Sequence, residues 1–185
     1  MNVQNTLLKS TIVGALVLLT LTASACSDDQ VKHSVTDQAV EDLKVLSADD
    51  MGGREAGTEG NAKARAYIIN RLVEMGVPAM NISYEVPFEY KPRRAAADAP
   101  MQNGVNIIAK IKGKNPGKAM AVTAHYDHVG TQGEDIYNGA DDNASGVAGA
   151  LAIADCFMEN PPENDVIIIF FDAEEKGLKG AFAYV

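Results

Sequence analysis

The sequence predicts an α/β domain in which helices cover a central β-sheet. Residues 166–171 form a continuous apolar run, which is typical of a strand buried on both faces of such a sheet. Residues 146–158 have apolar side chains near helical spacing, and residues 119–123 before them give a strand signal. A strand, helix, strand crossover of this kind would place the ends of the two strands side by side.

Two helices are expected ahead of these strands. Ser34 can cap the first helix, which should end near Asp49. Thr58 can cap a second helix that spans residues 59–75. Residues 52–57 between them are rich in glycine and predict a loop.

A hairpin is expected between the second helix and the crossover. Strand signals at residues 105–111 and 119–123 flank the turn-like segment 113–117, so we predict that these two strands pair directly. Residues 87–100 contain prolines, two arginines and a run of alanines, which indicates a surface connection within one domain.

The N-terminal residues 1–25 have the pattern of a secretory signal. Lys9 precedes an apolar run at residues 12–21, which is too short to span a membrane and ends in small residues. The segment ending at Cys26 resembles a bacterial lipoprotein processing site. We therefore expect a lipid anchor at Cys26 and a location at the outer membrane, with a periplasmic or secreted protein as the alternative.

Composition narrows the range of partners. The formal net charge is −9, which argues against nucleic acid as a partner. The two cysteines, Cys26 and Cys156, lie far apart in the sequence and imply no disulfide framework.

Three short polar segments lie where predicted strands or helices begin or end. His125 and Asp127 follow a strand, Asp141 and Asp142 precede a helix, and a pair of glutamates, Glu174 and Glu175, follows the buried strand. Imidazoles and carboxylates are the ligands of hydrolytic zinc sites, and Asp127 could orient the His125 ring. Taken singly, each segment also fits an ordinary polar loop, a helix cap or a surface turn.

Taken together, the three segments resemble the signatures of the family 28 metallopeptidases, which are two-zinc aminopeptidases. The resemblance lies in residues 125–130, 139–146 and 173–180, with weaker support at Gly53 and Arg54. It implies a three-layer sandwich of the zinc-exopeptidase type with a mixed, mostly parallel central sheet. It also implies peptide substrates and a water activated by two Zn²⁺ ions.

By this resemblance the site residues take separate roles. His125 would bind one zinc, Glu175 the other, and Asp142 both, with a cis peptide bond between Asp142 and Asn143. Glu174 would be the general base. Asp127 would act with His125, and His128 would support the site without binding metal.

The family needs two further ligands, an Asp and a His, downstream of Val185. We therefore expect a signal peptide at 1–25, a tether at 26–33 and a partial peptidase domain at 34–185, with weak or no activity of its own. Two other readings stay open: a short non-catalytic binding or scaffold module of the envelope, and a glutaminyl-cyclase-like enzyme.

Overall fold

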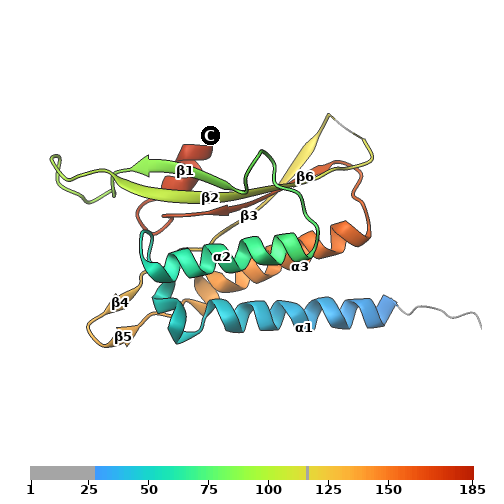
Figure 1. The fold of residues 1–185 in the computed structure, drawn as a ribbon, viewed down its shortest axis with the longest axis horizontal. Helices are drawn as coiled ribbons and strands as arrows, with labels where there is room; N and C mark the ends of the chain where they lie inside the picture. Colours follow the sequence, from blue (N-terminus) through green and yellow to red (C-terminus); the bar gives the residue numbers. More distant parts are fainter. Residues whose placement is uncertain (1–27, 116) are drawn as a thin grey trace, which may run out of the picture.

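The computed structural model describes residues 28–115 and 117–185, which form helices and strands (Figure 1). The helices are α1 (Asp28–Leu46), α2 (Glu59–Glu74), α3 (Ser145–Glu159) and α4 (Lys179–Tyr184), with short helical segments η1 (Asp49–Arg54) and η2 (Ala140–Ala144). The strands are β1 (Glu85–Tyr90), β2 (Gln102–Ile111), β3 (Ala119–His125), β4 (Thr131–Gln132), β5 (Asp135–Ile136) and β6 (Asp165–Phe171).

The central sheet has the strand order β1-β2-β6-β3 and is mixed, which confirms the predicted fold class. The expected majority of parallel strands is wrong for the part of the chain described. β1 with β2 and β2 with β6 pair antiparallel, and β3 with β6 alone pairs parallel. Parallel neighbours need a long crossover connection, and α3 provides it for this one pair.

The predicted hairpin between residues 105–111 and 119–123 is also wrong, because β6 lies between β2 and β3. The central position suits β6, because a central strand is covered on both faces and the apolar side chains of β6 are largely buried. The predicted crossover is confirmed. His125 at the end of β3 lies opposite Phe171 at the end of β6.

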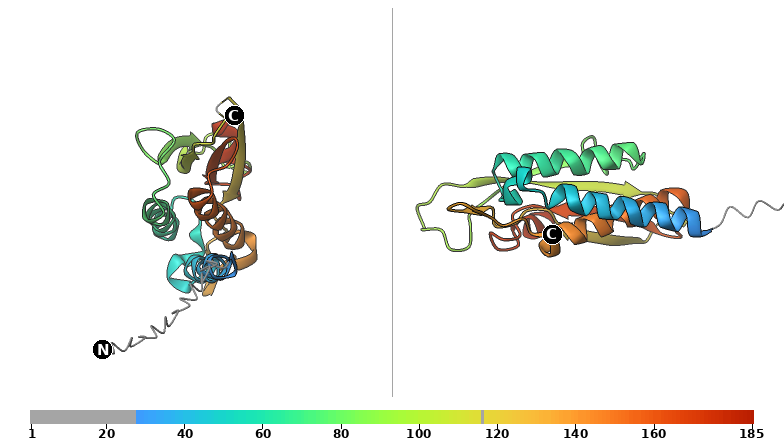
Figure 2. Two further views of the ribbon diagram at one scale, coloured as in Figure 1. Left: turned by 90° about the vertical axis from the view of Figure 1, so that its right-hand side faces the viewer. Right: turned by 90° about the horizontal axis from the view of Figure 1, so that it is seen from below.

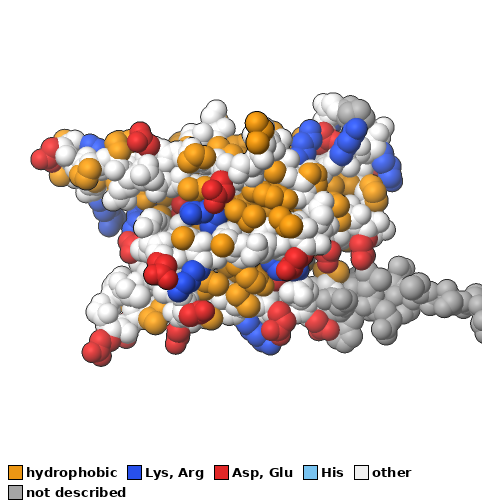
Figure 3. Space-filling model, in the orientation of Figure 1, with side chains coloured by type: hydrophobic (Ala, Val, Ile, Leu, Met, Phe, Trp, Pro, Cys, Tyr) orange, Lys and Arg blue, Asp and Glu red, His pale blue; other side chains and the backbone are white. Residues whose placement is uncertain are grey.

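Three helices stack on one face of the sheet (Figures 1 and 2). α2 and α3 contact the strands, and α1 packs against α3 farther from the sheet. α4 contacts β1 and β2 on the other face. The core between these layers is formed by fully buried apolar side chains, among them Leu46, Ile68, Leu72, Ile107, Leu151, Ile168 and Phe170. Charged side chains of both signs surround the apolar ones on the face seen in Figure 3.

Of the two helix starts predicted from the sequence, that of α2 is confirmed and that of α1 is wrong. Thr58 caps α2 as expected, because its side chain accepts a hydrogen bond from the backbone N–H of Asn61. α1 begins at Asp28 rather than at Ser34, so most of the expected tether is helical. Residues 28–33 contain no glycine or proline that would break a helix.

The expected signal peptide at 1–25 and the lipid anchor at Cys26 lie outside the described residues. Within the described ranges, every helix is too short or too polar to cross a lipid bilayer.

Candidate metal centre

The three polar segments meet at the ends of β3 and β6. The parallel pairing of these strands places the residues after His125 beside those after Phe171. The segment η2, which precedes α3, brings Asp142 to the same edge of the sheet. Ligands of α/β proteins commonly bind at this edge, where parallel strands end. The structure therefore brings His125, Asp142 and Glu175 into one cluster from three distant parts of the sequence.

Asp142 lies between two sets of ligand atoms. Its Oδ1 is 3.1 Å from Nε2 of His125. It also belongs to a group with His128 and Glu175 in which one ligand atom from each residue lies within 4.8 Å of the others. The peptide bond between Asp142 and Asn143 is cis, as expected from the family resemblance. Asp142 is thus close both to His125 and to the group that contains Glu175.

The conformation of η2 depends on Gly139. This residue has φ of 55°, in the left-handed region that favours glycine. A Cβ atom at this position would lie 2.4 Å from the backbone oxygen of Asp142 and 2.5 Å from the His128 ring. The absence of a side chain at position 139 therefore allows the Asp142 backbone and the His128 ring to pack against this residue.

His128 lies closer to the ligand atoms than the sequence suggested. Its Nδ1 is 2.9 Å from Oε1 of Glu175. We expected a supporting role for this residue, and the contact with Glu175 is compatible with one. The same position also makes His128 a possible nitrogen donor in the group with Asp142 and Glu175.

Asp127 contacts both the glutamate pair and the His125 ring. Its carboxylate is fully buried, and its two oxygens accept the backbone N–H groups of Glu174 at 3.0 Å and Glu175 at 3.2 Å. The Nδ1 atom of His125 is 3.7 Å from the Asp127 carboxylate and 3.1 Å from the Asp127 carbonyl oxygen. The carbonyl oxygen and the carboxylate of Asp127 thus both lie near the ring, and the ring-orienting role that we expected of the side chain stays a prediction.

The cluster concentrates negative charge around one imidazole. Burial opposes a charge on His125, but interactions with Asp127 and the charge of Glu174 outweigh it and raise the pKa of His125 to about 9. Burial raises the pKa of Glu174, His125 lowers it, and the neighbouring carboxylates Glu175, Asp127 and Asp142 raise it further. Mutually repelling carboxylates of this kind are the arrangement that a bound cation neutralises.

Arg54 is the residue that sequence reasoning undervalued. Its guanidinium is buried and donates hydrogen bonds to the carbonyl oxygens of Tyr126 at 2.9 Å, Asn138 at 2.7 Å and Gly139 at 3.0 Å, and to that of Leu46. Burial lowers its pKa, and the charges of Asp127 and Asp142 oppose that shift. One side chain thus ties together the segments on either side of the cluster. The sequence signal was only an arginine after two glycines.

The donor set fits zinc. Imidazole nitrogens and carboxylate oxygens are the usual ligands of hydrolytic zinc sites, and one such atom from each of His128, Asp142 and Glu175 lies within 4.8 Å of the others. His125 extends the same set through its contact with Asp142.

Comparisons with known proteins agree with this reading. Residues 106–185 match the family model described as peptidase family M28. A vacuolar membrane protease of Schizosaccharomyces pombe is 39% identical over 131 residues, which cover 67% of this chain and 15% of the relative. A probable zinc metalloprotease of Pyrenophora tritici-repentis is 25% identical over 170 residues, which cover 83% of this chain and 34% of the relative.

Two solved structures from Bacteroides thetaiotaomicron share the fold. One is a leucine aminopeptidase precursor and the other a glutaminyl cyclase bound to N-acetylhistamine. Each matches with a TM-score of 0.57 and 26% sequence identity over 75% of this chain. The chain spans 47% of the first structure and 46% of the second.

The relatives overturn the expected location at a bacterial outer membrane or in the periplasm. Relatives from Schizosaccharomyces japonicus, Schizophyllum commune and Schizosaccharomyces pombe are named vacuolar membrane proteases, and all are fungal. The expectation depended on a short N-terminal pattern, which is a weaker signal than similarity along the folded part of the chain.

Proposed function

Because the chain belongs to peptidase family M28 through residues 106–185, we propose that it forms the metal-binding part of a two-zinc aminopeptidase that removes N-terminal residues from peptides. The observation that supports this proposal most directly is the position of Asp142 between His125 and Glu175. A carboxylate that faces two sets of donors suits a bridging ligand.

The residues divide into two metal positions that share Asp142. His125 would hold one zinc and Glu175 the other, with His128 in contact with Glu175. Bound zinc supplies a water of lowered pKa and polarises the scissile carbonyl. Among the described residues each zinc would have one ligand of its own and the shared Asp142, fewer than the three protein ligands usual for catalytic zinc. We therefore expect this chain by itself to bind zinc weakly.

Glu174 would serve as the general base. Its carboxylate takes a proton from the attacking water and later gives it to the leaving amine, so no net proton is consumed by the protein. The hydrogen bonds from the backbone of Glu174 and Glu175 to the buried Asp127 carboxylate hold both residues at the end of β6. The neighbouring glutamates can therefore differ in role: Glu175 would bind the metal, and Glu174 would accept a proton from the water.

The test is the substitution Glu174→Gln in the full-length protein, with Glu134→Gln as the matched control. Glu134 is exposed in the turn between β4 and β5. We expect Glu174→Gln to keep its zinc and to lose turnover of a leucine anilide by about 100-fold to 10,000-fold. If Glu174→Gln turns over the anilide as fast as the Glu134→Gln control does, Glu174 is not the general base. Absence of any zinc-dependent hydrolysis in the unsubstituted protein would refute the aminopeptidase proposal and favour the non-catalytic module.

A second candidate is glutaminyl cyclisation, because the solved glutaminyl cyclase matches this chain as well as the aminopeptidase does. The cyclase releases ammonia from an N-terminal glutamine and leaves the peptide chain intact. Mass spectrometry of a peptide that begins with glutamine separates the two activities. A shortened peptide supports the aminopeptidase, and a peptide that has lost only ammonia supports the cyclase.

A further inference from the structure

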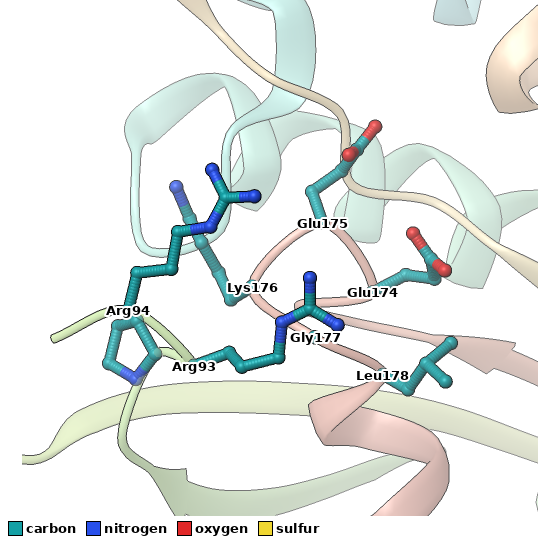
Figure 4. Close-up of a pocket in the computed structure, with 8 residues that line it drawn as sticks. Arg93, Arg94, Glu174, Glu175, Lys176, Gly177 and Leu178 are labelled. Atoms are coloured by element: carbon teal, nitrogen blue, oxygen red, sulfur yellow. The ribbon is translucent and has the colours of Figure 1, made fainter.

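A cavity of about 500 Å³ adjoins the glutamate pair. One wall is formed by Pro92, Arg93 and Arg94 from the connection between β1 and β2, and the other by residues 174–178. Figure 4 shows both arginine side chains extending toward the loop that holds Glu174 and Glu175. The proposed general base therefore shares a cavity with two guanidinium groups, although the sequence segments are far apart.

The arginine loop is attached to the glutamate loop by its backbone. The N–H of Arg93 donates a hydrogen bond of 3.0 Å to the carbonyl oxygen of Lys176. Gly177 follows with φ of 105°, and a Cβ atom there would lie only 3.0 Å from Cβ of Arg93. This contact fixes the start of both arginine side chains relative to Glu174, while their ends stay exposed.

The two guanidinium groups have no hydrogen-bond or ion-pair partner among the described residues, unlike the other basic group of the cavity. Lys176, which also lines the cavity, forms an ion pair with Glu55. The three remaining arginines of the chain, Arg54, Arg65 and Arg71, each donate to carbonyl or carboxylate oxygens. Arg93 and Arg94 thus present unused positive charge beside the place where a substrate would react.

We propose that Arg93 and Arg94 form a subsite for a substrate carboxylate. This inference rests on the proposed function, which places the scissile bond at Glu174. The planar guanidinium binds a carboxylate through paired hydrogen bonds, and two adjacent arginines strengthen that preference over neutral groups. The favoured substrates would be peptides with a carboxylate close to the scissile bond. This carboxylate would belong either to the acidic side chain of the N-terminal residue or to the C-terminus of a very short peptide.

The test compares Arg93→Gln and Arg94→Gln in the full-length protein with the control Lys118→Gln. Lys118 lies just before β3, at the end of that strand opposite the site, and its substitution removes the same charge. Glutamate and glutamine anilides probe the acidic side chain. The dipeptide Leu-Gly and its C-terminal amide probe the terminal carboxylate.

We expect each arginine substitution to lower the ratio of kcat/KM for the charged over the neutral substrate by about fivefold in one of the two pairs. The pair that responds identifies the source of the carboxylate. Lys118→Gln should leave both ratios as in the unsubstituted protein. If a leucine anilide is hydrolysed but neither ratio changes in the arginine variants, the subsite is refuted and the peptidase proposal stands.

A binding experiment keeps the inference testable if the protein hydrolyses none of these substrates. N-acetylglutamate, which carries both a side-chain and a terminal carboxylate, and N-acetylglutaminamide, which carries neither, are titrated into the zinc-loaded protein, and binding is followed by NMR. Preferential binding of N-acetylglutamate over N-acetylglutaminamide that is lost in the double variant of Arg93 and Arg94 supports the subsite. Equal binding of the two probes refutes it, whatever the protein's activity.

Discussion

The buried carboxylate of Asp127 accepts the backbone N–H of Glu174 over 3.0 Å, and so ties the loop after β3 to the loop after β6. The second oxygen of the same carboxylate accepts the N–H of Glu175. One side chain thus fixes the positions of two glutamates to which we assign different roles.

Replacing Asp127 should therefore damage stability and the site together. Asp127→Asn keeps the size of the side chain but turns one N–H acceptor into a donor, which leaves a buried donor facing another donor. We expect a loss of about 2–4 kcal/mol in the free energy of unfolding. Urea denaturation measures this loss, and zinc titration of the folded variant measures the effect on the site. Asp98→Asn, at an exposed position, is the control, and a variant as stable as that control would contradict the assignment.

Arg54 should matter more for stability than an arginine on the surface. Arg54→Met leaves the carbonyl oxygens of Tyr126, Asn138 and Gly139 without their donor. We expect a loss of about 3–5 kcal/mol, because these groups are buried or partly buried. Arg65→Met, which removes a surface ion pair with Glu85, should cost about 1 kcal/mol or less. Similar melting temperatures for the two variants would show that the buried contacts contribute little.

Zinc measurements can separate a ligand from a supporting histidine. If His128 supports Glu175 through their 2.9 Å contact, His128→Gln should weaken zinc binding by about 10-fold to 100-fold and leave the number of bound ions unchanged. If the site holds two ions, as we propose, His125→Gln should instead remove one of them. Metal analysis after dialysis measures the number, and competition with a chelator measures the affinity. Loss of an ion in His128→Gln would show that His128 is itself a ligand.

The pKa of Tyr90 leads to a prediction about the stability of the protein at alkaline pH. Burial, with the charges of Asp172, Asp127 and Glu55, raises its pKa to about 12. The unfolded chain ionises its tyrosines near pH 10, so the stability contributed by the protonated hydroxyl is full below about pH 10 and falls as the pH rises toward 12. Tyr90→Phe has no group to ionise at this position. Its stability relative to the unsubstituted protein should therefore increase between about pH 9 and pH 11.

At neutral pH the same substitution should be neutral or slightly stabilising. The Tyr90 hydroxyl is buried and lacks a hydrogen-bond partner among the described residues, so its removal costs little. Chemical denaturation at each pH measures the difference, and Tyr137→Phe controls for loss of a more exposed hydroxyl. A difference that stays constant as the pH rises would contradict the raised pKa of Tyr90.

Local patterns in the sequence predicted several elements well. Thr58 marks the start of α2, and the apolar run at residues 166–171 marks β6, because capping and burial leave signals within a few residues. The start of α1 and the direct pairing of the strands around residues 113–117 were wrong. Pairing depends on which strand reaches the centre of the sheet, and neighbouring residues do not record that choice.

The sequence by itself indicated the family, because three short segments together resemble its signatures, and it supplied imidazoles and carboxylates as candidate ligands at the ends of apolar elements. The tertiary structure alone decided how these residues meet. It directed the Asp127 carboxylate to the glutamate backbone, buried Arg54 among loop carbonyls and placed Arg93 and Arg94 beside Glu174. These contacts join residues tens of positions apart, so they depend on strand order and loop packing, which no local spacing reveals.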